Sequence, residues 1–271
     1  RRVLFRSTII AQFAADVLET PIDNISVYGV DTDISPYDSG SYASSTTYLT
    51  GMAAVKACEQ LRERIIALAA VRMNKDASAL TFDGENVIDE SDGAKMSLFD
   101  IATASMCNNE ISLEVTYSHS SPVSPPPFMA ACAEIEADPE TGAIELLDYT
   151  ACVDCGTVVN TNLARVQTEG GLLQGIGMTL YEDIWYDERG KNLSNSFMQY
   201  KVPSRLDTDR IRVEFDSSYE PTGPFGAKSI GEIVINTPAP AIADAVYNAT
   251  GVWINELPIT PEKILKGMKV I

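Results

Sequence analysis

Residues 120–127 read SSPVSPPP, and this proline-rich stretch constrains the fold more than any other segment. Proline fixes φ and has no backbone N–H, so the stretch can form neither a helix interior nor a central strand. It predicts an extended crossing at 122–127 between two folded regions. We therefore expect one α/β subdomain over 8–121 and a second over 128–271. Residues 1–7, RRVLFRS, lack an initiating methionine and are expected to be a foreign or truncated start.

Helical and strand patterns are mixed on both sides of this crossing. Apolar residues recur at helical spacing over 8–19, 48–72, 97–106, 161–182, 232–249 and 261–268. Strand patterns cover 24–32, 79–89, 110–118, 128–138, 143–154, 184–193 and 210–218, with hairpins at 79–89 and 184–193. The two kinds of element do not alternate as βαβ units do. The pattern therefore predicts an α+β fold, with mixed sheets and helices packed against them.

The charge of the chain excludes some classes of partner. It carries 38 acidic and 20 basic residues, a formal net charge of −18. Such a surface repels nucleic-acid phosphates and anionic lipid headgroups. No apolar run reaches the length of about 18 residues that indicates a transmembrane helix. We therefore expect neither nucleic acid nor a membrane as a partner.

The five cysteines bear on location and on metal binding. An odd number of cysteines, without a signal peptide, indicates a reducing compartment and so a cytoplasmic location. Cys152 and Cys155 have the spacing of a redox or metal pair. A metal site needs about four ligands, however, and no second pair accompanies them. We predict that these cysteines pack within or beside a strand rather than bind a metal.

Two stretches are rich in small polar residues or in glycine. In 38–51, DSGSYASSTTYLTG, hydroxyls precede a predicted helix and could hold an anion or form an ordinary N-cap loop. The predicted helix at 162–183 contains four glycines. A glycine in a helix costs about 1 kcal/mol relative to alanine, so four of them indicate close approach of another helix or of a ligand. Gln167 and Gln174 could present amides to a heteroaromatic ring.

The third stretch, GPFGAKSIGE at 223–232, places one acid after a glycine-rich turn. Glu232 is predicted at the start of a helix, where the helix dipole stabilises a carboxylate. It could cap that helix or act as a catalytic base that a substrate can reach. Lys228 could form an ion pair or contact a phosphate.

Taken in order, the three stretches match the motifs of one family. The chain has DTDISPYDSGSYASSTTYLTG, then DCGTVVNTNLARVQTEGGLLQGIG, then GPFGAKSIGE, followed by PAPAIADAVYNATG and LPITPEKIL. It resembles the C-terminal part of the molybdopterin-binding subunit of the xanthine dehydrogenase family of molybdenum hydroxylases. That part is also found as the medium molybdopterin subunit of nicotinate dehydrogenase-like enzymes. The resemblance covers nearly the whole chain from Thr8 onward.

The resemblance implies an oxidoreductase that acts together with partner subunits. It implies a molybdenum–molybdopterin cofactor, in the cytosine dinucleotide form, with 2Fe-2S and FAD centres on partner subunits. The partners would be the other molybdopterin-binding half, an iron–sulfur subunit and an FAD subunit. The implied reaction hydroxylates a carbon of a purine- or nicotinate-type heteroaromatic, using water. The alternatives are an aldehyde oxidase-like or carbon monoxide dehydrogenase-like subunit, or a non-catalytic relative.

The resemblance also implies roles for individual residues. Glu232, the acid that ends the GAKxxGE motif, would be the general base. We expect it to be buried, since desolvation raises the pKa of a carboxyl group toward neutral pH. The residues implied to contact the cofactor are Ala43, Ser44, Ser45, Gln167, Lys228 and Gly231.

Overall fold

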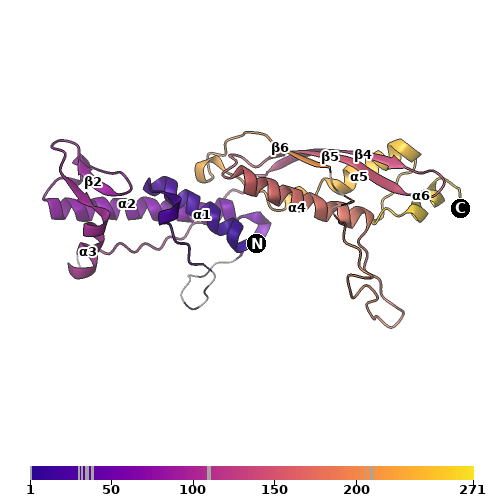
Figure 1. Cartoon of the computed structure of the whole chain (residues 1–271), viewed down its shortest axis with the longest axis horizontal. Helices are drawn as coiled ribbons and strands as arrows, with labels where there is room; N and C mark the ends of the chain where they lie inside the picture. Colours follow the sequence, from indigo (N-terminus) through magenta and orange to yellow (C-terminus); the bar gives the residue numbers. More distant parts are fainter. Residues whose placement is uncertain are drawn as a thin grey trace. The chain divides into compact units, whose positions relative to one another are not determined.

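The computed structural model describes residues 2–29, 31, 33, 37, 40–108, 111–204, 206–207 and 210–271. The chain divides into two compact units (Figure 1). Unit 1 contains residues 1–124 and 220–227, and unit 2 contains residues 125–219 and 228–271. Each unit combines helices with a three-stranded sheet, which confirms the predicted α+β class.

Unit 1 packs three helices with a small antiparallel sheet. Its helices are α1 (Arg2–Leu18), α2 (Gly51–Met73) and α3 (Leu98–Asn108), and its strands are β1 (Leu80–Phe82), β2 (Asn86–Asp89) and β3 (Lys95–Ser97), in the order β1-β2-β3. Leu68, Phe82, Val87 and Ile101 are buried together in its core. Ser97 caps α3, as its hydroxyl accepts a hydrogen bond from the Asp100 N–H at 3.1 Å.

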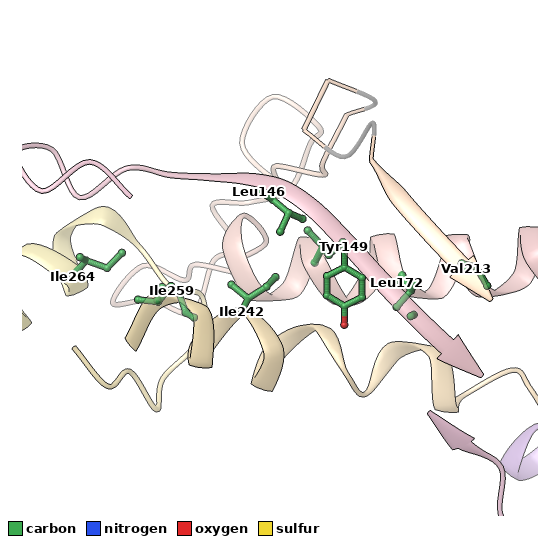
Figure 2. Packing of buried hydrophobic residues seen from close by; sticks show 10 residues of the cluster. Leu146, Tyr149, Leu172, Val213, Ile242, Ile259 and Ile264 are labelled. Atoms are coloured by element: carbon green, nitrogen blue, oxygen red, sulfur yellow. The ribbon is translucent and has the colours of Figure 1, made fainter. Parts of the chain in front are cut away.

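Unit 2 is built on a mixed sheet. Strand β4 (Phe128–Ala137) pairs antiparallel with β5 (Ile144–Asp154), and β6 (Ile211–Phe215) pairs with β5 in parallel. The helices of this unit are α4 (Thr161–Leu180), α5 (Pro238–Thr250) and α6 (Pro261–Gly267). Figure 2 shows Leu146 and Tyr149 of β5 among side chains of the helices, including Leu172 and Ile242. This apolar layer is the core of unit 2 and fixes α4 and α5 to one face of the sheet.

Two of the predicted strands are wrong, and the hairpin predicted at 184–193 is reduced to a single bridge between Tyr186 and Asn192. In the described residues 25–29 and 111–118 the backbone forms no strand. The first segment leaves Tyr28 exposed, so its apolar side chains have no core to join. In the second, the Arg64 guanidinium donates to the carbonyls of Ser112 and Glu114 at 3.1 and 2.5 Å. A side chain therefore binds carbonyls that a neighbouring strand would otherwise use.

The predicted helix at 232–249 begins later than expected. A single 3₁₀ turn, η6 (Ile233–Ile235), comes first, and α5 starts at Pro238. Proline suits the first helical position, because the N–H that it lacks would have no partner in the helix there. Glu232 therefore precedes a short turn rather than an α-helix. Among the described residues, no helix is both long enough and apolar enough to cross a bilayer.

Two glycines of α4 allow the segment that follows Glu232 to pack closely against the helix. A Cβ added at Gly171 would overlap the Val234 side chain, and one at Gly175 would lie 2.6 Å from Pro238 Cγ. At Gly170 the same atom would meet nothing within 4 Å. Close approach of η6 and α5 therefore explains two of the four glycines, and Gly170 faces open space.

This difference predicts opposite effects for adjacent alanine substitutions. Gly171→Ala should destabilise the protein by about 1–3 kcal/mol, because Val234 is buried and would have to shift. Gly170→Ala is the matched control, and it should be neutral or stabilising by up to about 1 kcal/mol through helix propensity. Urea unfolding of both variants measures the two free energies. Equal changes for the two substitutions would contradict the close approach.

Asp89 is a buried acid at the end of β2 with several donors. Its carboxylate lies 2.8 Å from Lys75 Nζ and accepts hydrogen bonds from the Ser91 N–H and hydroxyl, at 2.8 and 2.6 Å. The hydrogen bond from Lys75, and then those from Ser91, lower the pKa of Asp89 from 3.8 to about 2. The folded state thus favours the ionised carboxylate.

Because the pKa of Asp89 is lower in the folded state, its ionised carboxylate stabilises the fold, and we predict that acid removes this contribution. The contribution is complete above the ordinary pKa of 3.8 and is lost as the pH falls toward about 2. Asp89→Asn should therefore unfold at a lower temperature than the parent at pH 6, and the difference should shrink between about pH 4 and pH 2. Thermal unfolding across this range measures the difference. A gap that stays constant with pH would count against the assignment.

Candidate functional site

The predicted site residues are divided between the two units. Ala43, Ser44 and Ser45 belong to unit 1, whereas the others, Gln167, Lys228, Gly231 and Glu232, belong to unit 2. The ten-residue motif at 223–232 itself changes unit between Ala227 and Lys228. Each part of the site is therefore described within its own unit.

The segment 42–45 has an unusual backbone. Ala43 has φ 46° and ψ 33°, and Ser44 has φ 58°, so two successive non-glycine residues adopt left-handed conformations. Such residues cost about 1–2 kcal/mol each, and strain of this kind clusters at functional sites. The turn is closed by the Ser45 N–H, which donates to the Tyr42 carbonyl at 3.0 Å. Ala43 is exposed, and Ser44 and Ser45 are half-buried.

The first half of the glycine-rich motif packs within unit 1. The Tyr48 hydroxyl lies 2.7 Å from Thr222 Oγ1, and the Phe225 ring stacks on Phe13 with centroids 5.6 Å apart. A Cβ at Gly223 would overlap the Ala227 carbonyl, and Gly226 has φ 86°. These two glycines are thus required by the turn itself.

Lys228 opens the second half of the motif and is held on the end of β5. Its Nζ donates to Asp154 Oδ2 at 2.6 Å, and its backbone N–H donates to the Cys155 carbonyl at 2.8 Å. The Lys228 side chain is 7% exposed. Of the two roles that the sequence left open, the ion pair is present, and a contact of Lys228 with the cofactor stays a prediction.

Glu232 is exposed in unit 2, and the expectation of a buried carboxylate is wrong for the described chain. It stands at the N-terminus of η6 with φ −102° and ψ −27°, and its side chain does not cap that turn. The capping interpretation is therefore not supported. Glu232 lies in a turn between half-buried Gly231 and Val234, and Val234 is the first fully buried residue after it.

Gln167 lies on the side of α4 that approaches this turn. Positions 167 and 171 are four apart and so share one helix face. Gly171 contacts Val234, which is two residues after Glu232. The structure thus brings the half-buried amide of Gln167 and the Glu232 segment to the same face of α4.

Sequence reasoning missed two features of the site. The left-handed backbone at Ala43 and Ser44 has no residue signal, since neither residue favours positive φ. Asp154 begins the quoted stretch DCGTVVNTNLARVQTEGGLLQGIG, and its spacing from Gly156 is the one signal for its role, since it allows the acid to accept the Gly156 N–H at 3.0 Å. Its second oxygen binds Lys228.

Comparison with known proteins agrees with the resemblance seen in the sequence. A family model described as "Molybdopterin cofactor-binding domain" matches residues 6–209. The "Probable hypoxanthine oxidase XdhD" of Escherichia coli (strain K12) is 38% identical over 97% of this chain and 28% of its own length. The "6-hydroxypseudooxynicotine dehydrogenase complex subunit gamma" of Paenarthrobacter nicotinovorans is 33% identical over 95% of this chain and 34% of its own length.

Solved structures show the same fold. Quinoline 2-oxidoreductase from Pseudomonas putida 86 superimposes with a TM-score of 0.85 at 28% identity, over 97% of this chain and 35% of that protein. A Cu,Mo-CO dehydrogenase gives a TM-score of 0.84 at 26% identity, over 97% of this chain and 34% of that protein. The chain therefore spans about a third of the length of these relatives. It belongs to the molybdopterin cofactor-binding domains of the molybdenum hydroxylase, or xanthine dehydrogenase, family.

Proposed function

We propose that this chain is the molybdopterin-binding part of a molybdenum hydroxylase, with Glu232 as the general base. Its substrate would be a nitrogen heteroaromatic of the purine or nicotinate type, hydroxylated at carbon with oxygen from water. Relatives named for hypoxanthine, for a nicotine derivative and for quinoline support this substrate class. The likeness to a CO dehydrogenase, with its TM-score of 0.84, supports a carbon monoxide dehydrogenase-like activity as the second candidate.

The observation that carries the proposal is the placement of Glu232. The backbone before it is fixed at Lys228 by the Asp154 ion pair, and the backbone after it is fixed where Val234 enters the gap at Gly171. An exposed carboxylate between two fixed points is oriented yet accessible, which is what a base needs to take a proton from a reacting group. A carboxylate that merely kept the protein soluble would not need either anchor.

The residues that would hold the cofactor present neutral hydrogen-bonding groups. Ser44 and Ser45 offer hydroxyls in the strained turn, and Gln167 offers an amide on α4. A pterin has amide-like edges that such groups can bind, so the donor set fits it. The open space at Gly170, one turn from Gln167, leaves room for a group beside the helix. When bound, the molybdenum cofactor accepts the electrons of substrate oxidation.

The remaining residues complete the proposed cofactor contacts. Ala43 would approach the cofactor with little bulk, and Gly231 would let the backbone come close to it, because neither residue carries a long side chain. Lys228 would contact the cofactor with its ammonium group while that group stays paired with Asp154. We propose the cytosine dinucleotide form of the cofactor.

The proposed enzyme includes further subunits. These are the other molybdopterin-binding half, an iron–sulfur subunit with 2Fe-2S centres and a subunit with FAD. Support comes from the relatives named as subunits, such as the subunit gamma of a dehydrogenase complex and the large subunit of nicotine 6-hydroxylase. The five cysteines are free thiols, which is in keeping with a cytoplasmic location.

Replacing the proposed base tests the function directly. In the complex that contains this chain, Glu232→Gln should lower kcat about a hundredfold or more, since general base catalysis typically contributes 10²- to 10⁴-fold. Molybdenum content should stay near that of the parent, because the amide keeps the shape of the side chain. Steady-state kinetics with hypoxanthine, nicotinate and carbon monoxide, together with metal analysis, provide the measurements.

The matched control is Glu188→Gln, an exposed acid in the hairpin whose Tyr186 and Asn192 pair. It should leave kcat unchanged. Turnover of the Glu232→Gln enzyme within tenfold of the parent would rule out Glu232 as the base. Turnover of carbon monoxide but of neither heteroaromatic would favour the second candidate.

A further inference from the structure

We propose that Asp154 is a positioning residue for Glu232, acting through Lys228. In this inference, which rests on the proposed role of Glu232, Asp154 fixes the first residue of the segment 228–232. The end of β5 then sets where the carboxylate of Glu232 stands. None of these contacts requires the cofactor to be present.

Three hydrogen bonds meet at the carboxylate of Asp154. Oδ2 accepts from Lys228 Nζ at 2.6 Å. Oδ1 accepts from the Ser218 hydroxyl at 2.5 Å and from the Gly156 N–H at 3.0 Å. A carboxylate with three donors on both oxygens has one orientation, so it holds Lys228 in one place.

Both the backbone and the side chain of Lys228 are fixed. The Lys228 N–H donates to the carbonyl of Cys155, the residue that follows Asp154. The Lys228 ammonium also lies 5.4 Å from the centroid of the Phe128 ring. The segment that leads to Glu232 therefore starts from an anchored residue rather than from a free loop.

Both side chains of the ion pair between Lys228 and Asp154 are largely buried. The Lys228 side chain is 7% exposed and that of Asp154 is 18% exposed. Burial by itself raises the pKa of Asp154, but the hydrogen bonds from Lys228, Ser218 and Gly156 outweigh it, so that the pKa is lowered. Removing the charge of Asp154 leaves the Lys228 ammonium buried without a counter-charge, and this strongly destabilises its present position.

The second fixed point, Val234, lies only a few residues after Lys228 in the chain. Val234 fits against Gly171, and Pro238 fits against Gly175. Glu232 lies between Lys228 and Val234, so a shift of Lys228 moves the segment that carries it. A misplacement of about 1 Å at a reacting group can cost a hundredfold in rate.

The chain offers a matched control on the same strand. Asp148 of β5 accepts from Arg212 Nη2 at 2.8 Å, but the Arg212 side chain is 66% exposed. Asp148 has no bond to the segment 228–232 among the described contacts. Asp148→Asn thus removes a carboxylate and an ion pair from β5 without touching the anchor of Lys228.

The test compares Asp154→Asn, Asp148→Asn and Glu232→Gln in the complete enzyme complex. For Asp154→Asn we expect kcat per bound molybdenum to fall at least tenfold while KM changes less than threefold. Hydrogen–deuterium exchange should speed up in peptides covering 228–232 and stay unchanged in β4 and α6. Asp148→Asn should match the parent in both measurements. A merely structural role would lower the molybdenum content or raise exchange throughout unit 2, and leave kcat per bound molybdenum unchanged.

The outcomes separate this inference from the proposed function. Suppose that Glu232→Gln loses turnover. Asp154 is then not a positioning residue if Asp154→Asn keeps kcat per bound molybdenum within threefold of the parent. The same conclusion holds if hydrogen exchange at 228–232 is unchanged in that variant. If Glu232→Gln keeps its turnover, the base assignment is wrong and the inference falls with it. Should Asp154→Asn fail to fold, Ser218→Ala removes one bond to Oδ1 and leaves the ion pair. It should lower kcat per bound molybdenum about threefold at constant KM, and an unchanged value would overturn the inference.

Discussion

The close approach of residues 233–238 to helix α4 is the contact on which unit 2 depends. It exists because α4 lacks side chains at Gly171 and Gly175, where Val234 and Pro238 fit. Val234 is fully buried there, and Tyr149 of β5 donates from its hydroxyl to Thr237 Oγ1 at 3.0 Å, on the same short segment. The helix, the sheet and the turn after Glu232 are thereby joined in one packed layer. The glycines weaken α4 as a helix but permit this contact, and the buried area compensates for the loss.

Residue patterns predicted those elements whose side chains find a core. The strands at 128–137 and 144–154 and the helices α2 and α4 lie close to where apolar periodicity indicated. Residues 111–116 also alternate in burial, yet no strand pairs with them, because Arg64 binds the carbonyls of Ser112 and Glu114. Strand propensity depends on a partner that a local pattern does not reveal. The delayed start of α5 follows from Pro238 and could have been predicted from the residue type.

The motifs of the candidate site were predictable from the sequence, but the burial, the contacts and the backbone strain of its residues were not. The acid of GPFGAKSIGE does end a turn, but it is exposed and does not cap a helix. The glycine-rich turn was predictable, and Gly223 and Gly226 serve it, but its contact with Tyr48 was not, because the Tyr48 hydroxyl and Thr222 are 174 positions apart. The partner of Lys228 was equally hidden, since Asp154 lies 74 positions away. The strain at Ala43 and Ser44 comes from tertiary structure and leaves no trace in residue type.

We propose that the fold of this chain serves to hold a molybdenum-bearing pterin. The most direct test is to purify the chain in complex with its native partner subunits and to measure molybdenum and pterin in the same sample. We expect both to be present in equal amounts and to remain with the complex through gel filtration. A folded complex that contains neither molybdenum nor pterin would contradict it.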